Sequence, residues 1–364
     1  PDDVEGVIVD TVKPFVEKIE ESTVFTTTDT GMNTSATVKI RVTDKYYSRT
    51  SSMSDSTLLN NMKVYVNGSV VTSGITKEMV GPGLILAEIR ETDSGITTAE
   101  YGIEYEIKVT GFANNANQVK IVIPEDAMID TSGNGNEATP IIVYNCLKST
   151  SAETENTSTF LGITGIQRQN IENVTFLDSI SKVPEGATGP YDVSAQGDNS
   201  IRAWYTGSGT AKKVYIASDD KIYANQNASN LFKLIGRVSS SSEVITNIEL
   251  LNTNNVTNMD AMFDSFGYTS MTSLDLGNNF DTSNVTSAIH MFHQCGYSKM
   301  TSLILGDKFD TSNITNMYGM FDKCGYKMMT ELNLGNKFNT KNVTSMYAMF
   351  NECGYESMEK LILG

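Results

Sequence analysis

The chain has 364 residues, with 43 acidic and 27 basic side chains, so its formal net charge at pH 7 is −16. Its six arginines are scattered singly along the sequence, which excludes a basic stripe that could neutralise phosphates. We therefore expect no nucleic-acid partner, and no apolar run approaches the roughly 20 residues that a membrane-spanning helix needs. The abundance of Asn, Ser, Thr and Gly favours a mainly β protein over a helical enzyme.

Residues 1–146 alternate between apolar and polar side chains, as strands with one buried face do. The alternation is strict over 36–43, 101–109 and 119–123. Asn67-Gly68 lies between two apolar stretches and predicts a type I′ hairpin turn, because both residues readily adopt positive φ angles. Other strands are expected near Val7, Val16, Leu84 and Ile141. A total of about seven or eight strands predicts a β-sandwich.

Residues 147–159 are mostly Ser, Thr, Glu and Asn, a composition that predicts a linker. Residues 160–249 contain short apolar segments and are expected to form a cap for the repeats that follow. The sequence begins at Pro1 and not at a methionine, so we expect it to be part of a longer protein. Gly364 directly follows a Leu-x-Leu segment with no C-terminal cap, so we expect further repeats in that protein.

Residues 250–364 repeat with a period of 29 residues. A Val-Thr or Ile-Thr pair marks each unit, at Val256, Val285, Ile314 and Val343. Each unit also carries Met-Phe, Gly-Tyr and Leu-x-Leu at constant offsets. A short Leu-x-Leu strand cannot bury its apolar face alone, so stacked units are expected to form a solenoid with a parallel sheet. Apolar residues three and four apart in the Val-x-x-Met-x-x-Met-Phe segment predict a short helix or 3₁₀ turn.

The repeated residues resemble those of the BspA-like bacterial surface proteins, a leucine-rich-repeat family. The run 281–305, with Cys295 between Met291-Phe292 and Leu303-x-Leu305, carries this resemblance most clearly. Segments upstream of the repeats are similar to the part that precedes them in the same family, so the resemblance covers about residues 160–364. Residues 9–14 and 130–134 also resemble bacterial Ig-like modules. The resemblance implies an Ig-like β-sandwich followed by a capped leucine-rich-repeat solenoid.

This resemblance also implies a function. It points to an extracellular protein at the bacterial cell surface or cell wall, which adheres to a host protein, a matrix component or a glycan. We expect no enzyme activity and no cofactor. Two other functions stay open: a passive structural stalk or surface-layer segment, and the targeting module of a larger secreted enzyme.

Few side chains suggest chemistry. His290 and His293 are the only histidines, and the other repeats hold Ala, Gly, Asp or Asn at their positions, so we expect surface or packing roles and no metal site. The cysteines of the repeats share one position with Phe266, which predicts a buried apolar slot. These cysteines are Cys295, Cys324 and Cys353.

Acidic side chains cluster at two places where calcium could bind, since carboxylates suit a hard cation. One cluster is Asp126 with Asp130, and the other comprises Asp2, Asp3, Glu5 and Asp10. We favour a solvated acidic surface at both places.

Two sets of repeated positions are candidate binding surfaces. Residues before and within each Leu-x-Leu strand should point away from the core. They vary from unit to unit and are Ser273, Asp275, Ser302, Ile304, Glu331, Asn333, Lys360 and Ile362. The second set is the column Tyr268, Tyr297, Tyr326 and Tyr355, because exposed aromatic rings stack on sugars or anchor protein contacts. A column packed over the methionines Met271, Met300, Met329 and Met358 is equally compatible with the pattern. Asn255, Asn284, Asn313 and Asn342 are expected to cap local turns.

Overall fold

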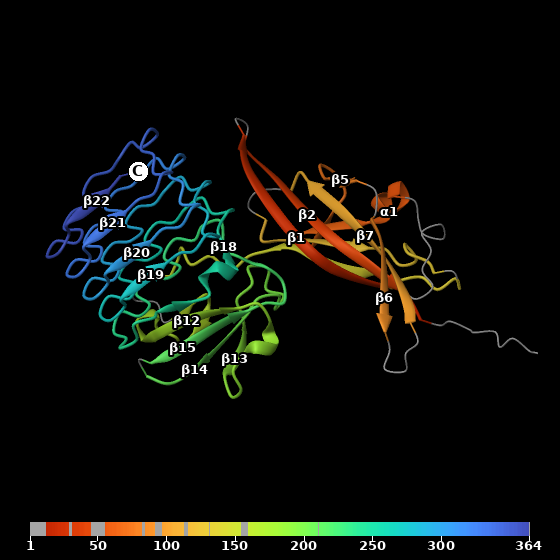
Figure 1. Ribbon diagram of the computed structural model, residues 1–364, viewed down its shortest axis with the longest axis horizontal. Coiled ribbons are helices and arrows are strands. Elements are labelled where there is room, and N and C mark those ends of the chain that lie inside the picture. Colours follow the sequence, from red (N-terminus) through yellow and green to blue (C-terminus); the bar gives the residue numbers. More distant parts are fainter. Residues whose placement is uncertain are drawn as a thin grey trace, which may run out of the picture. The chain divides into compact units, whose positions relative to one another are not determined.

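The computed structural model describes residues 12–28, 31–44, 55–81, 84–91, 97–112, 116–130, 132–153, 159–209 and 211–363. These residues are mainly β, with a single α-helix among them, α1 (Asp55–Asn61). The chain divides into two compact units, Pro1–Tyr144 and Asn145–Gly364 (Figure 1). Among the residues described, no helix has the length and apolar composition needed to cross a lipid bilayer.

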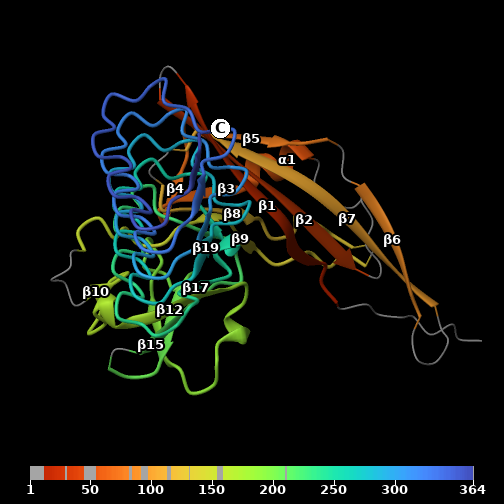
Figure 2. The ribbon, with the colours of Figure 1, turned by 60° about the vertical axis from the view of Figure 1, so that its left-hand side comes forward.

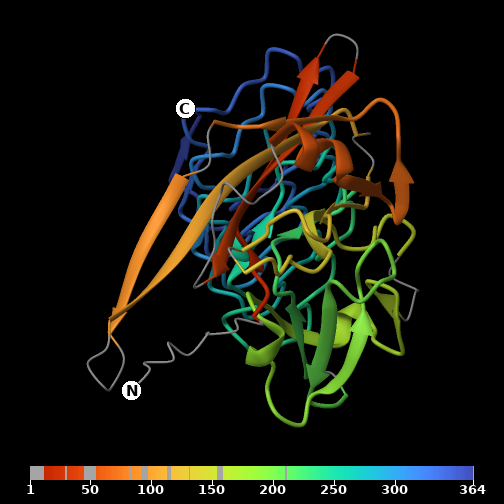
Figure 3. The same ribbon diagram turned by 90° about the vertical axis from the view of Figure 1, so that its right-hand side faces the viewer.

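The first unit contains two sheets (Figures 1 and 3). One sheet has the order β1 (Phe15–Thr28), β2 (Gly31–Asp44), β7 (Thr97–Thr110) and β5 (Thr76–Met79), with β6 (Leu84–Glu91) also paired to β7. The other has the order β4 (Ser69–Val71), β3 (Lys63–Val66), β8 (Gln118–Ile123) and β9 (Thr139–Asn145). Strands β1, β2, β5, β6 and β7 pair in antiparallel fashion.

The period-two pattern explains these strands. Val38 and Ile40 on β2 are at most 1% exposed, whereas Lys39 between them is half-buried. The hairpin turn is confirmed, since Asn67 and Gly68 have φ angles of 50° and 78° and join the paired strands β3 and β4. Strands near Val16, Leu84 and Ile141 are also confirmed, while Val7 lies outside the described residues. Strand β5 and helix α1 were not predicted.

The second unit begins with a hairpin and a mixed five-stranded sheet (Figure 2). The hairpin is β10 (Thr159–Phe160) with β11 (Ile163–Thr164). The sheet has the order β13 (Thr188–Asp192), β14 (Arg202–Thr206), β15 (Lys212–Ala217), β12 (Ile171–Leu177) and β17 (Ile245–Thr246). Three short 3₁₀ helices accompany it: η2 (Arg168–Asn170), η3 (Ile180–Lys182) and η4 (Ile248–Leu250). Strand β12 runs parallel to both β15 and β17.

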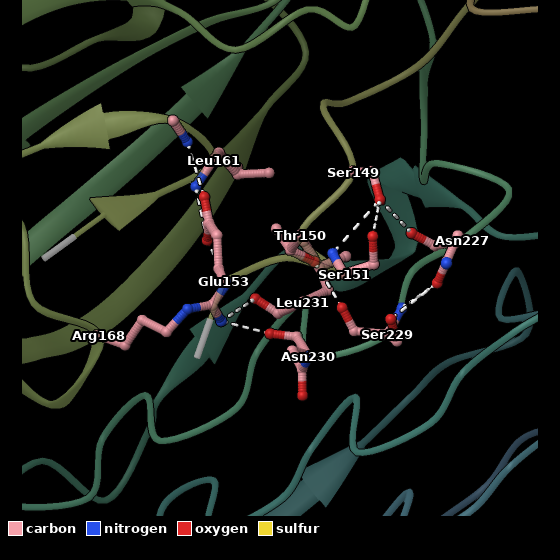
Figure 4. A network of polar contacts seen from close by, with 11 residues as sticks. Ser149, Thr150, Ser151, Glu153, Leu161, Arg168, Asn227, Ser229, Asn230 and Leu231 are labelled. Atoms are coloured by element: carbon pink, nitrogen blue, oxygen red, sulfur yellow. Dashed lines mark hydrogen bonds and ion pairs between the residues drawn. The ribbon is translucent and has the colours of Figure 1, made fainter. Parts of the chain in front are cut away.

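The segment expected to be a linker is instead largely built into the second unit. Leu147 is fully buried and forms a bridge with Ser194, and Thr150 donates a hydrogen bond of 2.7 Å to the carbonyl of Ser229. The carboxylate of Glu153 is buried in an ion pair with Arg168 and also accepts the N–H of Gly162 (Figure 4). The polar residues of this segment form hydrogen bonds and an ion pair with buried groups. A polar composition therefore did not mean that the segment is exposed to solvent. Residues 154–158 lie outside the description.

Five coils follow one another in the rest of this unit, and we call residues 222–363 the repeat stack (Figure 1). The coils are 222–250, 251–279, 280–308, 309–337 and 338–363. Their short strands are β16 (Ile222–Tyr223), β18 (Leu251–Asn252), β19 (Ser273–Asp275), β20 (Ser302–Ile304), β21 (Glu331–Asn333) and β22 (Lys360–Ile362). Strand β16 pairs with β18, β19 with β20 and β21 with β22, all in parallel. Leu274 lies opposite Leu303, so the period of 29 sets the register.

The first coil lies outside the period recognised in the sequence. Asn227 forms a parallel bridge with Asn258, and the ring of Phe232 stacks on that of Phe263 with centroids 5.3 Å apart. These pairs are 31 residues apart, whereas Ile222 and Leu251 are 29 apart, because the first coil has two residues fewer between β16 and the phenylalanine than the second coil has between β18 and its phenylalanine. In the sequence, the first coil could have been recognised from the pair Leu231-Phe232, which corresponds to Met262-Phe263 of the second coil.

The turn segment of each coil, such as residues 259–267, is a series of tight turns and not the short helix or 3₁₀ turn that we predicted. Ala261 has a φ angle of 53°, which a right-handed helix excludes. Its N–H donates to the carbonyl of Ile289 in the next coil at 2.7 Å, whereas the N–H of Met262 donates to Met259 at 3.2 Å. Hydrogen bonds between coils thus replace every second local bond.

The core of the stack is made of columns of identical side chains. Phe263, Phe292, Phe321 and Phe350 stack nearly parallel, with successive centroids 5.4, 5.3 and 5.5 Å apart. This spacing is close to the distance between neighbouring strands. Burial decreases in the fifth coil. Leu361 there is 41% exposed, whereas Leu332, at the same position of the fourth coil, is fully buried.

Candidate functional site

The strand face consists of the outward residues of β19 to β22. It comprises Ser273, Asp275, Ser302, Ile304, Glu331, Asn333, Lys360 and Ile362. Ser302 and Ile362 are half-buried and the others are exposed, while the leucines between them on β19, β20 and β21 are buried. This arrangement agrees with the predicted alternation. The face therefore presents a different chemistry at each coil on a constant backbone.

Several strand-face side chains are held in place by the backbone. The Asp275 carboxylate accepts the N–H of Gly277 at 2.8 Å, and Asn333 accepts that of Gly335 at 2.9 Å. Lys360 lies 3.4 Å from the Glu331 carboxylate in the neighbouring coil. The two backbone hydrogen bonds restrict the side chains of Asp275 and Asn333.

A groove of about 600 Å³ lies at the start of the strand face. It is lined by residues 242–249 of the first coil and by Ser273 and Asp275 of the second. The lining combines hydroxyl and carboxylate groups, among them those of Glu243 and Glu249, with apolar side chains such as Val244 and Ile248. The sequence pattern missed the first-coil residues because that coil departs from the 29-residue motif. A second hollow of about 420 Å³ shares Glu249 and is lined by Asp178, Asp219 and Asp220 among others.

The four repeat tyrosines form a continuous ladder. Successive ring centroids from Tyr268 to Tyr297, Tyr326 and Tyr355 are 4.7, 4.6 and 5.3 Å apart. Tyr355 is 68% exposed and the other three are half-buried. Burial and the negative charges of Glu352 and Glu356 raise the pKa of Tyr326. Tyr297 and Tyr326 each lie between two rings, so only their edges and hydroxyls are available and sugars cannot stack on them.

Glycine and methionine residues under the ladder explain its geometry. Gly296 precedes Tyr297 with a φ angle of 58°, and a Cβ atom there would lie 2.3 Å from the Cβ of Met300. The same relation joins Gly267 and Met271. The methionine column thus occupies the space that a side chain at each glycine would need. The tyrosines lie beside this column, in agreement with the alternative that they pack over the methionines.

The two histidines take part in contacts between coils. His293 Nδ1 lies 2.9 Å from the Asp264 carboxylate and its Nε2 lies 3.7 Å from Asp322. Burial would raise the pKa of Asp264, but the hydrogen bond with His293 and the charge of Lys233 outweigh it and lower the pKa. His290 packs edge-on against Tyr318 and leaves room only for Gly319. Both histidines are half-buried packing residues.

The cysteine position is a buried apolar slot, as predicted. Cys295 and Cys324 are fully buried, Cys353 is half-buried, and Phe266 occupies the same place in the second coil. The hydrogen bond with Cys295 and burial raise the pKa of Cys324, and burial raises that of Cys353. The raised pKa values favour the protonated thiols of Cys324 and Cys353, which disfavours nucleophilic chemistry at these two residues.

Polar columns join the coils, and one prediction about them was wrong. Asn313 Nδ2 donates to Ser283 O at 2.6 Å and Asn342 Nδ2 to Ser312 O at 2.7 Å, in the preceding coil, so these two asparagines do not cap local turns. Asn284 Nδ2 likewise donates to Asn254 O at 2.7 Å. A buried threonine column was missed: Thr282 donates to the carbonyl of Asp310 and accepts its N–H. The 29-residue period identified the asparagine and threonine positions in the sequence. Their hydrogen-bond partners lie in neighbouring coils, so only the folded structure shows them.

Of the two acidic clusters, the structure describes the one at Asp126 and Asp130. Asp130 is 1% exposed, and its carboxylate accepts the N–H groups of Ser132 and Asn134 at 2.8 Å each, so it is neither solvated nor open to a cation. The cluster at Asp2, Asp3, Glu5 and Asp10 lies outside the described residues. In the described part of the chain, no three His, Cys, Asp or Glu side chains converge as metal ligands.

Comparison with known proteins gives one match. Residues 217–324 match a family described as Mycoplasma protein of unknown function, DUF285. The match covers less than a third of the chain and extends from the last residue of β15 into the fourth coil. No curated protein and no solved structure matches the chain.

Proposed function

We propose that this chain belongs to a bacterial cell-surface protein that binds extracellular ligands through the strand face and has no catalytic role. The observation that carries the proposal is the strand face itself, whose exposed residues change from coil to coil while the leucines between them are retained. Such a surface suits recognition by many weak contacts. The match to a family of unknown function in Mycoplasma is compatible with this proposal.

We further propose that the repeat stack is a variant leucine-rich-repeat solenoid capped by the five-stranded sheet, and that residues 1–144 are an Ig-like sandwich serving as a spacer. The in-register pairing of Leu274 with Leu303 and of Leu332 with Leu361 supports the solenoid. Two sheets with alternating buried residues support the sandwich.

The groove beside β19 suggests the ligand chemistry. Glu243, Glu249 and Asp275 provide carboxylates, while Ser242, Thr272 and Ser273 provide hydroxyls. Carboxylates and hydroxyls bind the hydroxyls of a glycan or the cationic groups of a host or matrix protein. The rest of the strand face would add contacts at Ile304, Asn333 and Lys360.

Purified chain on arrays of glycans and matrix proteins tests the proposal. We expect the double change Ser273→Arg and Asp275→Arg to weaken binding at least about tenfold, because it fills and recharges the groove. Tyr297→Ala, away from the strand face, should leave affinity within about twofold. Absence of binding to every surface would favour a passive stalk or surface-layer segment. Equal losses in both variants would contradict the assignment to the strand face.

The remaining alternative is a targeting module of a secreted enzyme. Under that alternative the strand face would bind the polymer that a neighbouring catalytic domain cleaves. A full-length protein that hydrolyses the array ligand, and loses this turnover on Asp275→Arg, would favour it over adhesion.

A further inference from the structure

Two columns of aromatic rings run along the repeat stack in different surroundings. The rings of Phe263, Phe292 and Phe321 are fully buried. In the tyrosine ladder, Tyr355 is 68% exposed and the other three rungs are half-buried. A phenol hydroxyl can lose a hydrogen atom to an oxidant, whereas the ring of phenylalanine has no such group. Of the two columns, the tyrosine ladder therefore offers reactive groups that an oxidant in solution can reach.

Successive rings of the ladder face one another. Their centroids are 4.7, 4.6 and 5.3 Å apart, and their planes are inclined by 6°, 9° and 21°. Oxidised tyrosines couple through the ring carbon beside the one that carries the hydroxyl. Equivalent tyrosines extend from equivalent positions of the coils, so these carbons follow one another along the same edge of the ladder. The reacting groups are thus held together before oxidation, which favours coupling within one chain.

Backbone hydrogen bonds fix the separation of the rungs. The N–H of Lys327 donates to the carbonyl of Tyr297 at 3.1 Å. The N–H of Glu356 donates to the carbonyl of Tyr326 at 3.0 Å. The residue after each of these rungs is therefore bonded to the preceding tyrosine. Within the described part of the chain, the four tyrosine hydroxyls form no hydrogen bond with another protein group, so their protons can pass to water.

We propose that the tyrosine ladder is a site of oxidative cross-linking, at which a haem peroxidase with hydrogen peroxide joins successive tyrosines of one chain as dityrosine. For each link, the peroxidase reduces one molecule of hydrogen peroxide to two of water. Each of the two tyrosines gives up one electron and its hydroxyl proton. A carbon–carbon bond then forms between the rings, and the hydrogen on each coupling carbon moves to the oxygen of its own ring. Each link thus removes two hydrogen atoms from the chain.

A link between successive rungs closes a covalent loop between coils 29 residues apart. Like a disulfide, such a link restricts the unfolded chain and so stabilises the folded one. The link from Tyr326 to Tyr355 would join the fourth coil to the fifth, where Leu361 is 41% exposed. The strand face takes no part in this chemistry, so the proposal does not depend on the ligand binding proposed above.

Treatment of the intact chain at ~1 µM with a haem peroxidase and hydrogen peroxide, followed by trypsin and mass spectrometry, tests the proposal. The blue fluorescence of dityrosine measures the yield. Rungs of one chain have an effective concentration of the order of mM, so links within a molecule should exceed links between molecules at least about tenfold. An equal mixture of isotope-labelled and unlabelled chain measures this ratio. Hydrogen peroxide without peroxidase is the control, which oxidises methionine but should join no rings.

One pair of tryptic peptides is diagnostic. Trypsin leaves Tyr297 in peptide 238–299 and Tyr326 in peptide 324–327, and we expect these two peptides to be joined. Tyr268 shares the first peptide, so Tyr268→Phe and Tyr297→Phe are matched variants that each retain a ring and remove one hydroxyl. The joined product should be lost in Tyr297→Phe and retained in Tyr268→Phe. The linked chain should also unfold at a higher urea concentration than the peroxide control, as followed by circular dichroism.

Absence of dityrosine from treated chain that keeps its native circular dichroism would overturn the proposal. Persistence of the joined peptides in Tyr297→Phe would do the same, because the bond would then involve another residue. Links that pair labelled with unlabelled chain as often as random mixing predicts would show that coupling takes place between molecules and not along the ladder. An unchanged urea midpoint in linked chain would contradict the stabilising role of the links.

Discussion

The two units bury their side chains in different ways. In the first unit, Val38 of β2 lies opposite Ile107 of β7, and each buried residue meets partners of other types from distant segments. In the repeat stack, Phe292 lies between Phe263 and Phe321, its equivalents one period away on either side. The constant positions of the stack, such as the phenylalanine column, thus provide an interior rung and an end rung with the same residue type. The stack can therefore be tested by matched changes that a sheet does not offer.

The largest effect is expected for Phe292→Ala, which removes a fully buried ring from the middle of the phenylalanine column. It should lower the free energy of unfolding of the second unit by about 3–5 kcal/mol. The fluorescence of Trp204, the only tryptophan, reports this unfolding in urea. Phe350→Ala, at a half-buried rung with one neighbouring ring, should cost less than half as much. Equal losses would contradict a core carried by the interior coils.

Gly296→Ala should be the next most destabilising change. Alanine is strained at a φ angle of 58°, and the new Cβ would lie 2.3 Å from Met300. Together these effects should cost about 2–4 kcal/mol. Gly335→Ala has a similar φ angle of 74° but open space around its Cβ, and should cost only about 1 kcal/mol. Thermal unfolding compares the two variants, and the packing explanation is wrong if they melt together.

Thr282→Val tests the buried threonine column, and Thr286→Val provides the comparison with a column of exposed threonines. Thr282→Val removes a hydroxyl that donates to the Asp310 carbonyl at 2.8 Å and accepts its N–H at 2.7 Å, leaving both backbone groups without a partner. We expect a loss of about 1–3 kcal/mol in urea unfolding. Thr286→Val changes an exposed threonine whose backbone N–H still bonds to Thr257, and should cost under about 0.5 kcal/mol. A larger loss for Thr286→Val would reverse the ranking of the two columns.

The smallest effect is expected for Asp264→Asn and depends on pH. The pKa of Asp264 is lower in the folded state, so its charge stabilises the fold above the unfolded value of about 3.9 and this contribution is lost as the pH falls through the folded value. The variant should be up to about 1 kcal/mol less stable at pH 7, with a difference that shrinks below about pH 4. Asp307→Asn, an exposed control, should show no such difference. Urea unfolding at several pH values measures both, and a constant difference would contradict the role of the charge.

Residue patterns located the features that depend on neighbours in the sequence or on the period. Asn67-Gly68 formed the expected hairpin turn, since its φ angles are a local property. The 29-residue interval between Leu274 and Leu303 set their register, because identical coils pack best with like residues aligned. The outward positions of the strand face followed from the same alternation. The turn segment was predicted wrongly because its hydrogen bonds cross between coils.

Repetition in the amino-acid order was thus enough to establish the stacked coils, their buried leucines and the cysteine slot, because these follow from the period and from the need to bury apolar side chains. The folded chain alone decided that Glu153 lies buried against Arg168, that the first coil joins the stack and that its carboxylates line a groove with Asp275. Each of these depends on partners with no fixed spacing in the chain. Burial of a polar residue is set by the partner it finds, and such partners meet only after folding.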